Sequence, residues 1–561
     1  MLQIPYPTSY KRNLTKSVQI AHLEVGGNAP ILIQSMLVNP ASKLDQAIAE
    51  MKKLVDVNCQ LIRLSLPTHK ELEASFRLKE RMKTEGLTVP LVADVHFNPS
   101  LAIDAAEVFD KIRINPGNFV DSPKGSGKLY SNAEFSEGRE KLLEALKPLI
   151  TNLKKYRRAL RIGVNQGSLS ERMIFQFGDS PQGMVESALE ACELCTQLDY
   201  DQIIISLKSS NPIIVNQAYR LLVTRQDADR KFPLHLGVTE AGTGPIARVK
   251  SLVGIGSLLR DGIGDTIRVS LAEDSHHEIP VAEEIAKCLS KPQLSASDEQ
   301  GGDFKRLLGA SLFTPGVHRL NGRDITSGAP VLIGYESMQP VADADFIYSH
   351  SENQVLVNGE TIPIVKDLTK TALKKANHPP SLIVDSVPSL FALRAFFRDT
   401  PKDFALGLVA PTLEGDIFFE TEFSSILCEG FFDFILLPNA LNRHAHASLE
   451  LYLQASRVKS FAADYIACPS CGRTLFDLQK TTEMIRSKTL HLKGIKIGIM
   501  GCIVNGPGEM ADAHFGYVGS GPGKIDLYFG QTRVQRGIDE SLAVEALIAL
   551  IKEKNQWYEA K

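Results

Sequence analysis

Eight short β-rich runs alternate with longer helical stretches over the first 290 residues, and this alternation constrains the fold more than any other feature. The runs cover residues 31–37, 59–66, 90–97, 111–117, 160–168, 202–209, 234–242 and 266–272. Strands separated by helices pair in parallel through right-handed crossovers. Eight such units in about 250 residues predict a (β/α)₈ barrel, with an open doubly wound sheet as the alternative.

A polar stretch containing Gly and Ser follows the last of these units. We expect the barrel to occupy residues 1–293 and the polar stretch to form a linker at 294–304. Further β-like runs predict an inserted α/β domain over residues 305–455, with a structural role. A third unit, residues 456–561, contains a strand-like segment, a hairpin-like segment and a closing helix.

The overall charge and the cysteine content exclude several classes of protein. A net charge of −3 gives no general reason to expect nucleic acid or an anionic membrane as a partner. The sequence has no secretory signal and no uncharged apolar run long enough to span a membrane. Eight cysteines in 561 residues are too sparse for a disulfide scaffold. We therefore expect a cytoplasmic protein, in which a Cys-x-x-Cys motif indicates metal or redox chemistry.

Polar residues gather near the C-terminal ends of the expected strands, often two positions apart. Such pairs share one face of a strand, and barrel active sites lie at this end. Four arginines and a lysine converging there would repel one another unless an anion lay between them. We expect a small phosphorylated substrate, although any one of these residues alone is often a structural ion pair or a strand-end cap. The residues are Arg63, Ser65, Asp94, His96, Arg113, Asn115, Arg161, Asn165, Lys208, Glu240, Arg268 and Ser270.

Three cysteines and a carboxylate mark the third unit. Cys468 and Cys471 lie in "CPSCGRT", whereas Cys502 and Glu509 lie in the Gly-rich "GCIVNGPGE". An iron–sulfur cluster accepts thiolates from dispersed loops, and a carboxylate in place of a fourth thiolate would leave one iron more exchangeable. The residues favour such a cluster but leave three alternatives open. These are a zinc site with His491 or His514 as fourth ligand, a redox dithiol, and cysteines with no metal or redox role.

The remaining cysteines lack such a context. Cys192 and Cys195 form a second Cys-x-x-Cys motif, but it lies within a helical pattern with no third thiol nearby. Because cysteine is often simply a small buried hydrophobic residue, we expect these two to pack in a core. The same expectation holds for Cys59, Cys288 and Cys428.

Together these motifs resemble the 4-hydroxy-3-methylbut-2-enyl diphosphate synthases of the non-mevalonate isoprenoid pathway. The resemblance is carried by "ADVHFNP", "KIRINPGN", "RIGVNQGSL", "SLKSSN", "GVTEAGTG", "DTIRVSLAED" and "IKIGIMGCIVNGPGEMADA". The middle insertion resembles the three-domain form of plants and some bacteria. The resemblance implies a TIM barrel joined to a sulfite-reductase-like α+β iron–sulfur domain. It also implies reductive ring opening and dehydration of 2-C-methyl-D-erythritol 2,4-cyclodiphosphate to 4-hydroxy-3-methylbut-2-enyl diphosphate.

The same resemblance implies a role for each candidate residue. A [4Fe–4S] cluster would be held by Cys468, Cys471, Cys502 and Glu509. The diphosphate would be bound by Arg63, Arg113, Arg161, Lys208 and Arg268, with further polar contacts from Asp94, His96, Asn115, Asn165 and Ser270. Glu240 would be the acid or base, with His96 as a second candidate proton donor.

The resemblance also implies partners. Ferredoxin or flavodoxin would deliver the electrons, and short-form relatives suggest a homodimer. One departure is His514, where related long-form sequences tend to have an acidic residue. Two readings from other classes compete: a zinc-stabilised phosphate-binding protein without redox chemistry, and a sugar-phosphate isomerase or aldolase that uses Lys208 as a Schiff-base nucleophile.

Overall fold

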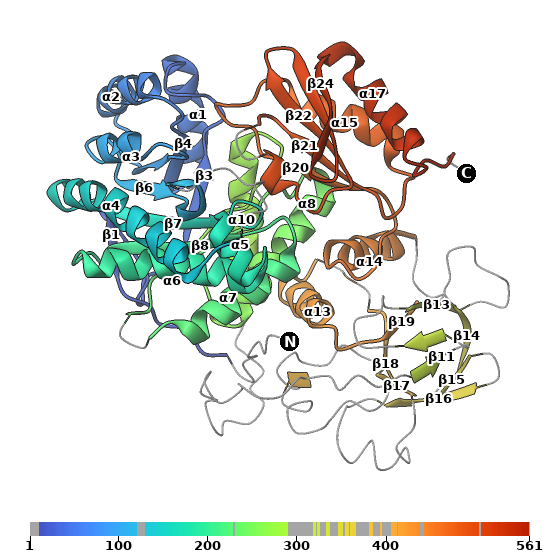
Figure 1. The fold of residues 1–561 in the computed structure, drawn as a ribbon. Coiled ribbons are helices and arrows are strands. Elements are labelled where there is room, and N and C mark those ends of the chain that lie inside the picture. Colours follow the sequence, from blue (N-terminus) through green and yellow to red (C-terminus); the bar gives the residue numbers. More distant parts are fainter. Residues whose placement is uncertain are drawn as a thin grey trace. The chain divides into compact units, whose positions relative to one another are not determined.

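The computed structural model describes residues 10–120, 129–227, 230–289, 443–503 and 506–559, together with short segments between 318 and 437. The chain divides into two compact units. One comprises Asn13–Leu258, Ile263–Ala286 and Ala462–Lys561, and it holds the barrel and the C-terminal domain (Figure 1). The other comprises Met1–Arg12, Leu259–Gly262 and Lys287–Phe461. The expected linker at 294–304 lies outside the described residues, and the domain boundaries drawn from the sequence stay predictions.

Eight parallel strands form the barrel, one within each of the eight β-rich runs, so this prediction is confirmed. The hydrogen-bonded order is β8-β7-β6-β5-β4-β3-β10-β9, and a bridge between Ile205 and Leu234 joins the two ends. The strands are β3 (Leu32–Met36), β4 (Leu61–Ser65), β5 (Leu91–Asp94), β6 (Lys111–Ile114), β7 (Ala159–Asn165), β8 (Ile203–Lys208), β9 (His235–Leu236) and β10 (Thr266–Ile267).

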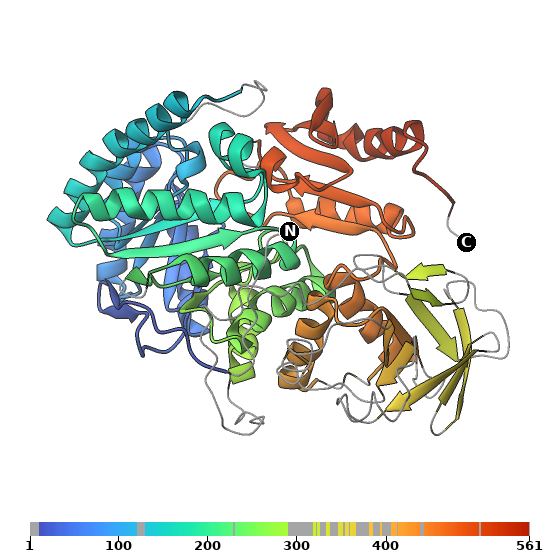
Figure 2. The ribbon, with the colours of Figure 1, turned by 60° about the horizontal axis from the view of Figure 1, so that its bottom comes forward.

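Helices surround these strands (Figures 1 and 2). Polar residues start several of them: the side chains of Thr68, Asn98, Ser131 and Asn211 accept hydrogen bonds from backbone N–H groups in the first turn. The helices are α1 (Leu44–Asp56), α2 (His69–Thr84), α3 (Pro99–Ala105), α4 (Asn132–Tyr156), α5 (Glu171–Phe177), α6 (Pro181–Gln197), α7 (Pro212–Arg225), α8 (Gly244–Ser251), α9 (Ser257–Arg260) and α10 (Glu278–Ala286).

A short hairpin that the strand pattern did not predict closes the N-terminal end of the barrel. It consists of β1 (Val18–Ile20) and β2 (Leu23–Val25). Its apolar side chains pack with Leu32, Leu61 and Val92, which lie at or near the starts of barrel strands. Burying this end leaves the opposite, C-terminal end of the strands for the polar residues.

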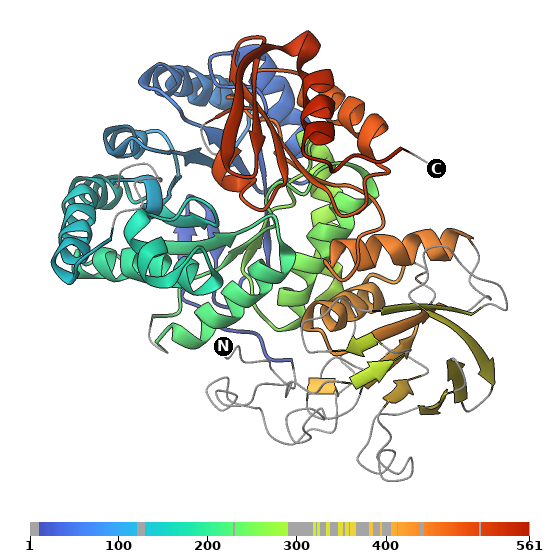
Figure 3. The ribbon, with the colours of Figure 1, turned by 45° about the vertical axis from the view of Figure 1, so that its right-hand side comes forward.

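The C-terminal domain is a five-stranded sheet in the order β20-β21-β22-β23-β24. Its strands are β20 (Asp464–Ala467), β21 (Lys496–Met500), β22 (Phe515–Gly521), β23 (Lys524–Phe529) and β24 (Thr532–Asp539). The first three run parallel and the last two form the expected hairpin. Helices α15 (Leu478–Thr489) and α17 (Glu540–Glu553) lie on the same side of this sheet (Figures 1 and 3).

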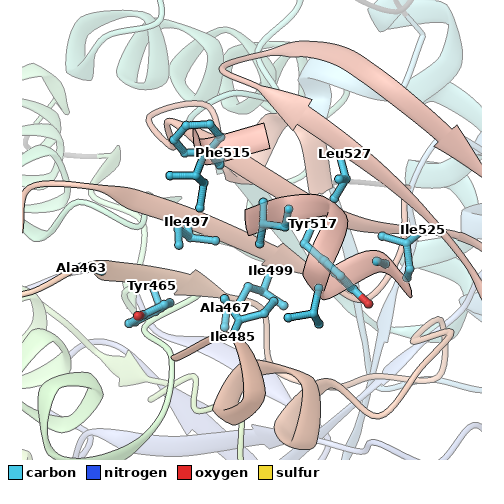
Figure 4. Packing of buried hydrophobic residues seen from close by; sticks show 14 of the residues in the cluster. Ala463, Tyr465, Ala467, Ile485, Ile497, Ile499, Phe515, Tyr517, Ile525 and Leu527 are labelled. Atoms are coloured by element: carbon cyan, nitrogen blue, oxygen red, sulfur yellow. The ribbon is translucent and has the colours of Figure 1, made fainter. Parts of the chain in front are cut away.

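An apolar core holds these helices on the sheet. Ile497, Ile499, Tyr517 and Leu527 belong to one buried cluster that also includes Leu547 of α17 (Figure 4). The short α16 (Gly506–Glu509) follows the loop after β21. The sheet therefore fixes the starting points of the two loops that carry the cysteines.

The inserted unit contains a second, smaller barrel with mixed strand directions. The segment β14–β16 is antiparallel, whereas the other pairings are parallel. Its strands are β13 (Leu332–Glu336), β14 (Phe346–Ser351), β15 (Gln354–Val357), β16 (Glu360–Val365), β17 (Ser381–Val384), β18 (Ala405–Val409) and β19 (Phe434–Leu437), with helices α13 (Ile417–Glu429) and α14 (Arg443–Ala455). In the described part of the chain, no helix is long and apolar enough to cross a bilayer.

Candidate active site

A small cavity of about 80 Å³ lies between the C-terminal ends of the barrel strands and the cysteine-bearing loops of the C-terminal domain. Its walls contain Arg63, Asp94, His96, Arg113, Arg161, Asn165, Lys208, Glu240, Arg268, Cys468, Cys471, Cys502 and Glu509. Apart from Asn115 and Ser270, these are all the residues assigned a role by resemblance. Both walls come from one chain, so the barrel mouth is covered by its own C-terminal domain.

The cationic side chains of this cavity are buried with few partners. Arg161 is 1% exposed, and its Nε and Nη1 have no hydrogen-bond partner among the described residues. Arg63 donates from Nε and Nη2 to the weakly accepting thioether of Met36, at 3.2 and 3.0 Å. Burial and the neighbouring arginines lower the pKa of Arg63 to about 10 and that of Lys208 well below its usual range. Because unpaired buried charge is costly, this arrangement is suited to an anionic ligand.

Arg268 is a cation of the cavity that has a carboxylate partner, as Arg113 also has. It donates from Nε and Nη2 to the two oxygens of Glu278, at 3.2 and 3.1 Å. Glu278 also accepts from the Ser35 hydroxyl at 2.7 Å. The side chain of Arg268 is thus held in place before any ligand binds.

Asp94, His96 and Arg113 form a buried network at one edge of the cavity. Arg113 Nη1 donates to Asp94 Oδ1 at 3.0 Å and lies 2.5 Å from His96 Nε2. Burial and then the charge of Arg113 lower the pKa of His96 to about 3. Although burial opposes ionisation, Arg63 and Arg113 hold the pKa of Asp94 well below its usual range. At neutral pH the network therefore comprises a carboxylate, a neutral imidazole and a guanidinium.

Two carboxyl groups meet where the barrel and the C-terminal domain face each other. Glu240 and Glu509 both line the cavity. Burial is the main cause that raises the pKa of both, and the charge of Glu509 raises that of Glu240 further. Asn165 Nδ2 donates to Glu509 Oε1 at 2.9 Å, whereas Glu240 Oε2 has no hydrogen-bond partner in the part of the chain that the structure describes. Glu240 also has a φ of +50°, which is unfavourable for a residue other than glycine. The next residue, Ala241, bridges to Ala467 of β20 and helps to hold this conformation.

The three thiols lie on loops that follow strands of the C-terminal sheet. Cys468 comes directly after β20, and its Sγ accepts from Gly501 N at 3.2 Å. Cys471 begins a tight turn, in which its N–H donates to Thr474 Oγ1 at 3.0 Å and its carbonyl accepts from Thr474 N at 2.9 Å. Cys502 follows β21. The structure thus brings all three thiols to the wall that faces the barrel.

The other candidate metal ligands lie elsewhere. The Nε2 of His491 is 2.8 Å from the Tyr558 carbonyl, and His514 Nδ1 accepts from Lys496 N at 3.1 Å. Neither histidine lines the cavity. Cys192 and Cys195 are buried in α6, as packing residues would be.

Three of the polar residues expected at the barrel mouth do not line the cavity: Ser65, which is buried at the end of β4, Asn115 and Ser270. Asn115 accepts from Gly117 N at 3.1 Å and so caps a short 3₁₀ turn, whereas Ser270 is buried beyond the end of β10. The sequence patterns did not indicate seven other lining residues of the two domains: Met36, Ser206, Thr239, Pro469, Arg473, Met500 and Gly506. Arg473 could have been found from its position beside Cys471, and Pro469 and Gly506 from their positions within the cysteine motifs, whereas no pattern pointed to the other four.

Close contacts hold the C-terminal domain against the barrel. Lys250 of α8 pairs with Asp464 of β20 at 2.5 Å, and both side chains are buried. After β7, the backbone of Gly167 touches the backbone of Gly508, since a Cβ added to Gly167 would lie 1.8 Å from Gly508 O. These contacts make the cavity part of one packed body.

The fold and the cavity define a class of protein: a (β/α)₈ enzyme whose cation-rich mouth is covered by a cysteine-bearing domain. Comparison with protein families narrows this class. Residues 15–283 match the GcpE TIM-barrel domain, and residues 464–553 match the GcpE protein C-terminal domain. The chain belongs to the 4-hydroxy-3-methylbut-2-en-1-yl diphosphate synthase family of the non-mevalonate isoprenoid pathway. The expected family, fold class and enzyme class are therefore confirmed.

Relatives match along almost the whole chain. The 4-hydroxy-3-methylbut-2-en-1-yl diphosphate synthase (flavodoxin) of Akkermansia muciniphila is 39% identical and covers 99% of both chains. The chloroplastic, ferredoxin-type synthase of Oryza sativa subsp. japonica is 34% identical, covering 98% of this chain and 88% of its own. Among solved structures, dihydropteroate synthase from Burkholderia cenocepacia aligns with 48% of this chain and 95% of its own at 15% identity. Its TM-score of 0.32 is too low to support an argument.

Proposed function

We propose that the chain converts 2-C-methyl-D-erythritol 2,4-cyclodiphosphate to 4-hydroxy-3-methylbut-2-enyl diphosphate and water, consuming two electrons. The observation that carries this proposal is the composition of one cavity. Five basic residues of the barrel face three thiols and Glu509 of the C-terminal domain. The basic residues suit a doubly phosphorylated substrate, whereas the thiols suit a redox centre.

The donor set fits a [4Fe–4S] cluster held by Cys468, Cys471, Cys502 and Glu509. Among the described residues, no three His, Cys, Asp or Glu side chains are close enough together to hold one metal ion. A cluster binds each ligand to a different iron, so its ligands lie further apart than those of a single zinc ion. The two histidines that could have completed a zinc site also make other hydrogen bonds. When bound, such a cluster would supply the two electrons that no side chain of the cavity can provide.

The diphosphate lies, in this proposal, among Arg63, Arg113, Arg161, Lys208 and Arg268. The unpartnered N–H groups of Arg161 support this placement, because phosphate oxygens would satisfy them. Arg268 and Arg113 are already fixed by Glu278 and Asp94, so they would orient the phosphates with little reorganisation. A cavity lined by buried cations would also stabilise negative charge that develops on the phosphate as the ring opens.

Glu240 is proposed as the group that protonates the departing hydroxyl. Its Oε2 is buried, has no hydrogen-bond partner and lines the cavity. A neutral His96 between Arg113 and Asp94 is instead suited to orienting a substrate oxygen by hydrogen bonding. Asn165 would hold Glu509 through its 2.9 Å hydrogen bond. Asn115 and Ser270, which lie off the cavity, are proposed to support the loops around it.

An external one-electron carrier of the flavodoxin or ferredoxin type is proposed as the electron donor. The relatives from Akkermansia and rice carry these donors in their names. A reducing compartment such as the cytoplasm suits an enzyme with thiolate ligands. The inserted unit is proposed to be structural, and a homodimer is compatible with a site formed within one chain.

The deciding experiment combines metal analysis with turnover. We would purify the wild type, Cys502→Ser and Cys195→Ser without oxygen, and measure iron, acid-labile sulfide and conversion of the cyclodiphosphate. Cys195 is a matched control, because it belongs to the Cys-x-x-Cys motif buried in α6. About four irons and four sulfides in the wild type and in Cys195→Ser, with loss of both iron and turnover in Cys502→Ser, are expected. Zinc without sulfide in the wild type, even after anaerobic reconstitution, would contradict the proposal.

A further inference from the structure

Arg473 brings a positive charge from the C-terminal domain into a cavity whose other cations belong to the barrel. It lies two residues after Cys471 in the loop between β20 and α15, and its side chain is half-buried. Among the described residues that line the cavity, it is the single cation from this domain. The strand pattern that revealed the basic residues of the barrel does not extend to this loop.

The position of Arg473 is fixed at both ends. At its backbone, the turn between Cys471 and Thr474 is closed by two hydrogen bonds of 3.0 and 2.9 Å. Gly472, inside that turn, lies so close to the barrel that an added Cβ would be 3.0 Å from Pro40 Cβ. At its other end, Arg473 Nη2 donates to the main-chain oxygen of Asp94 at 3.2 Å. The guanidinium therefore reaches from the cysteine loop to the C-terminal end of β5.

The contact with Asp94 O leaves most N–H groups of the Arg473 guanidinium available to bind a ligand. An arginine has five N–H donors, and within the described residues Arg473 uses one of them in a hydrogen bond. Its charge also contributes to the low pKa of His96, after burial and Arg113, so the group lies close to the polar network of the barrel. A buried carbonyl is a weak counterpart for a full positive charge, whereas a phosphate oxygen is a strong one.

We propose that Arg473 is a substrate-binding residue. It couples the binding of substrate in the barrel to the docking of the cysteine loop, the loop between β20 and α15 that carries Cys471. It binds a phosphate oxygen of the cyclodiphosphate from the side opposite the barrel cations, while its contact with Asp94 O keeps the loop on the mouth. Substrate affinity thus depends on both domains. This inference rests on the proposed function, because it takes the cyclodiphosphate as the ligand.

The test measures binding without turnover. Wild type, Arg473→Gln and Arg473→Lys, each with its metal centre intact and with no reductant present, would be titrated with the cyclodiphosphate in an anaerobic calorimeter. Lys480→Gln is the matched control, since it removes one positive charge from an exposed position seven residues further along, on α15. Losing a hydrogen bond to a charged group should raise the Kd about 10- to 100-fold in Arg473→Gln, with a smaller effect in Arg473→Lys and none in Lys480→Gln.

A rescue experiment separates ligand binding from loop folding. In Arg473→Ala, millimolar guanidinium should restore part of the lost affinity, whereas in the wild type it should not strengthen binding. A Kd within twofold of the wild type in Arg473→Gln with unchanged iron would overturn the proposal. So would a loss of affinity that neither lysine nor guanidinium restores, since that would indicate a purely structural role. If the wild type itself fails to bind the cyclodiphosphate, the proposed function fails together with this inference.

Discussion

Asn165 at the end of β7 donates a 2.9 Å hydrogen bond to Glu509 of the C-terminal domain, across 344 residues of sequence. The bond joins the substrate side of the cavity to the proposed metal side. Asn165 also lies 3.5 Å from Arg113 Nη2 through its Oδ1, so its amide is oriented from both sides.

This relationship predicts the effect of Asn165→Ala. Glu509 would lose a donor and become free to rotate, so we expect kcat/KM to fall about 10- to 100-fold, as for other hydrogen bonds to charged groups. The electron paramagnetic resonance spectrum of the reduced protein should also change, because Glu509 is a proposed ligand. Asn152→Ala is the control, since Asn152 of α4 donates to the Ile103 carbonyl away from the cavity. An unchanged spectrum with unchanged activity would show that Asn165 does not position Glu509.

Arg161→Met should change the stability of the fold and the affinity for the cyclodiphosphate in opposite directions. Arg161 is buried with two donor nitrogens unpartnered, so replacing it with an apolar side chain should raise the free energy of unfolding by about 1–3 kcal/mol. The same change should weaken cyclodiphosphate binding at least tenfold. Urea denaturation and calorimetric titration measure the two effects. The comparison variant is Arg172→Met, which breaks a buried pair with Glu190 and should lower stability. Destabilisation by Arg161→Met would show that this arginine is a structural residue.

Gly167→Ala should disturb the contact between the domains. The added methyl group would have to occupy the position of Gly508 O, at a backbone φ of +78°. We expect turnover to fall at least tenfold, because the segment that carries Cys502 and Glu509 could no longer dock on the barrel mouth. Gly86→Ala imposes a similar backbone strain at φ +70° but meets no atom within 4 Å. It should cost about 1–2 kcal/mol of stability and leave turnover unchanged. Equal turnover in the two variants would show that turnover does not depend on the contact between Gly167 and Gly508.

The buried His96 predicts how stability depends on pH. Its pKa is about 3 in the folded protein and about 6.5 in the unfolded chain. Between pH 7 and pH 5 the unfolded chain therefore takes up a proton that the folded protein does not, and stability falls with the pH. Over this interval the free energy of unfolding, measured by urea denaturation, should fall by about 2 kcal/mol less in His96→Gln than in the wild type.

The other charged groups that face His96 do not obscure the difference in pH dependence between the wild type and His96→Gln. Arg113 and Arg473 are cations, and Asp94 has a pKa held well below its usual range, so it stays ionised down to pH 5. His22→Gln, at an exposed position outside the cavity, is the control. Identical pH profiles for the wild type and His96→Gln would mean that His96 takes up a proton in the folded protein.

The barrel could be predicted from the sequence because its strands are separated by helices, which forces parallel pairing. The same pattern placed Arg63 and Arg113 correctly, since they lie within β4 and β6. Asn115 and Ser270 lie beyond the ends of β6 and β10 and do not line the cavity, whereas His96 and Arg268, which also lie beyond strand ends, do line it. Alternation of side chains holds only while the backbone remains a strand.

The remaining features of the site depend on contacts between distant segments. Arg473 lies on a turn, and no local periodicity indicates which cavity its side chain enters. The hairpin β1–β2 was missed because each strand has three residues, too few for a pattern. That Glu240 meets Glu509 follows from the packing of two domains, which the order of residues in either domain does not reveal.

The bridge between Ala241 and Ala467 is made by main-chain atoms, one residue after Glu240 and one before Cys468. Backbone hydrogen bonds do not depend on side-chain identity. Substitutions at the two bridging positions that keep the bridge would therefore leave Glu240 and Cys468 in the same relative position. A single insertion or deletion in either segment would instead shift their register. In any redesign of this enzyme, the lengths of these two loops must therefore be preserved.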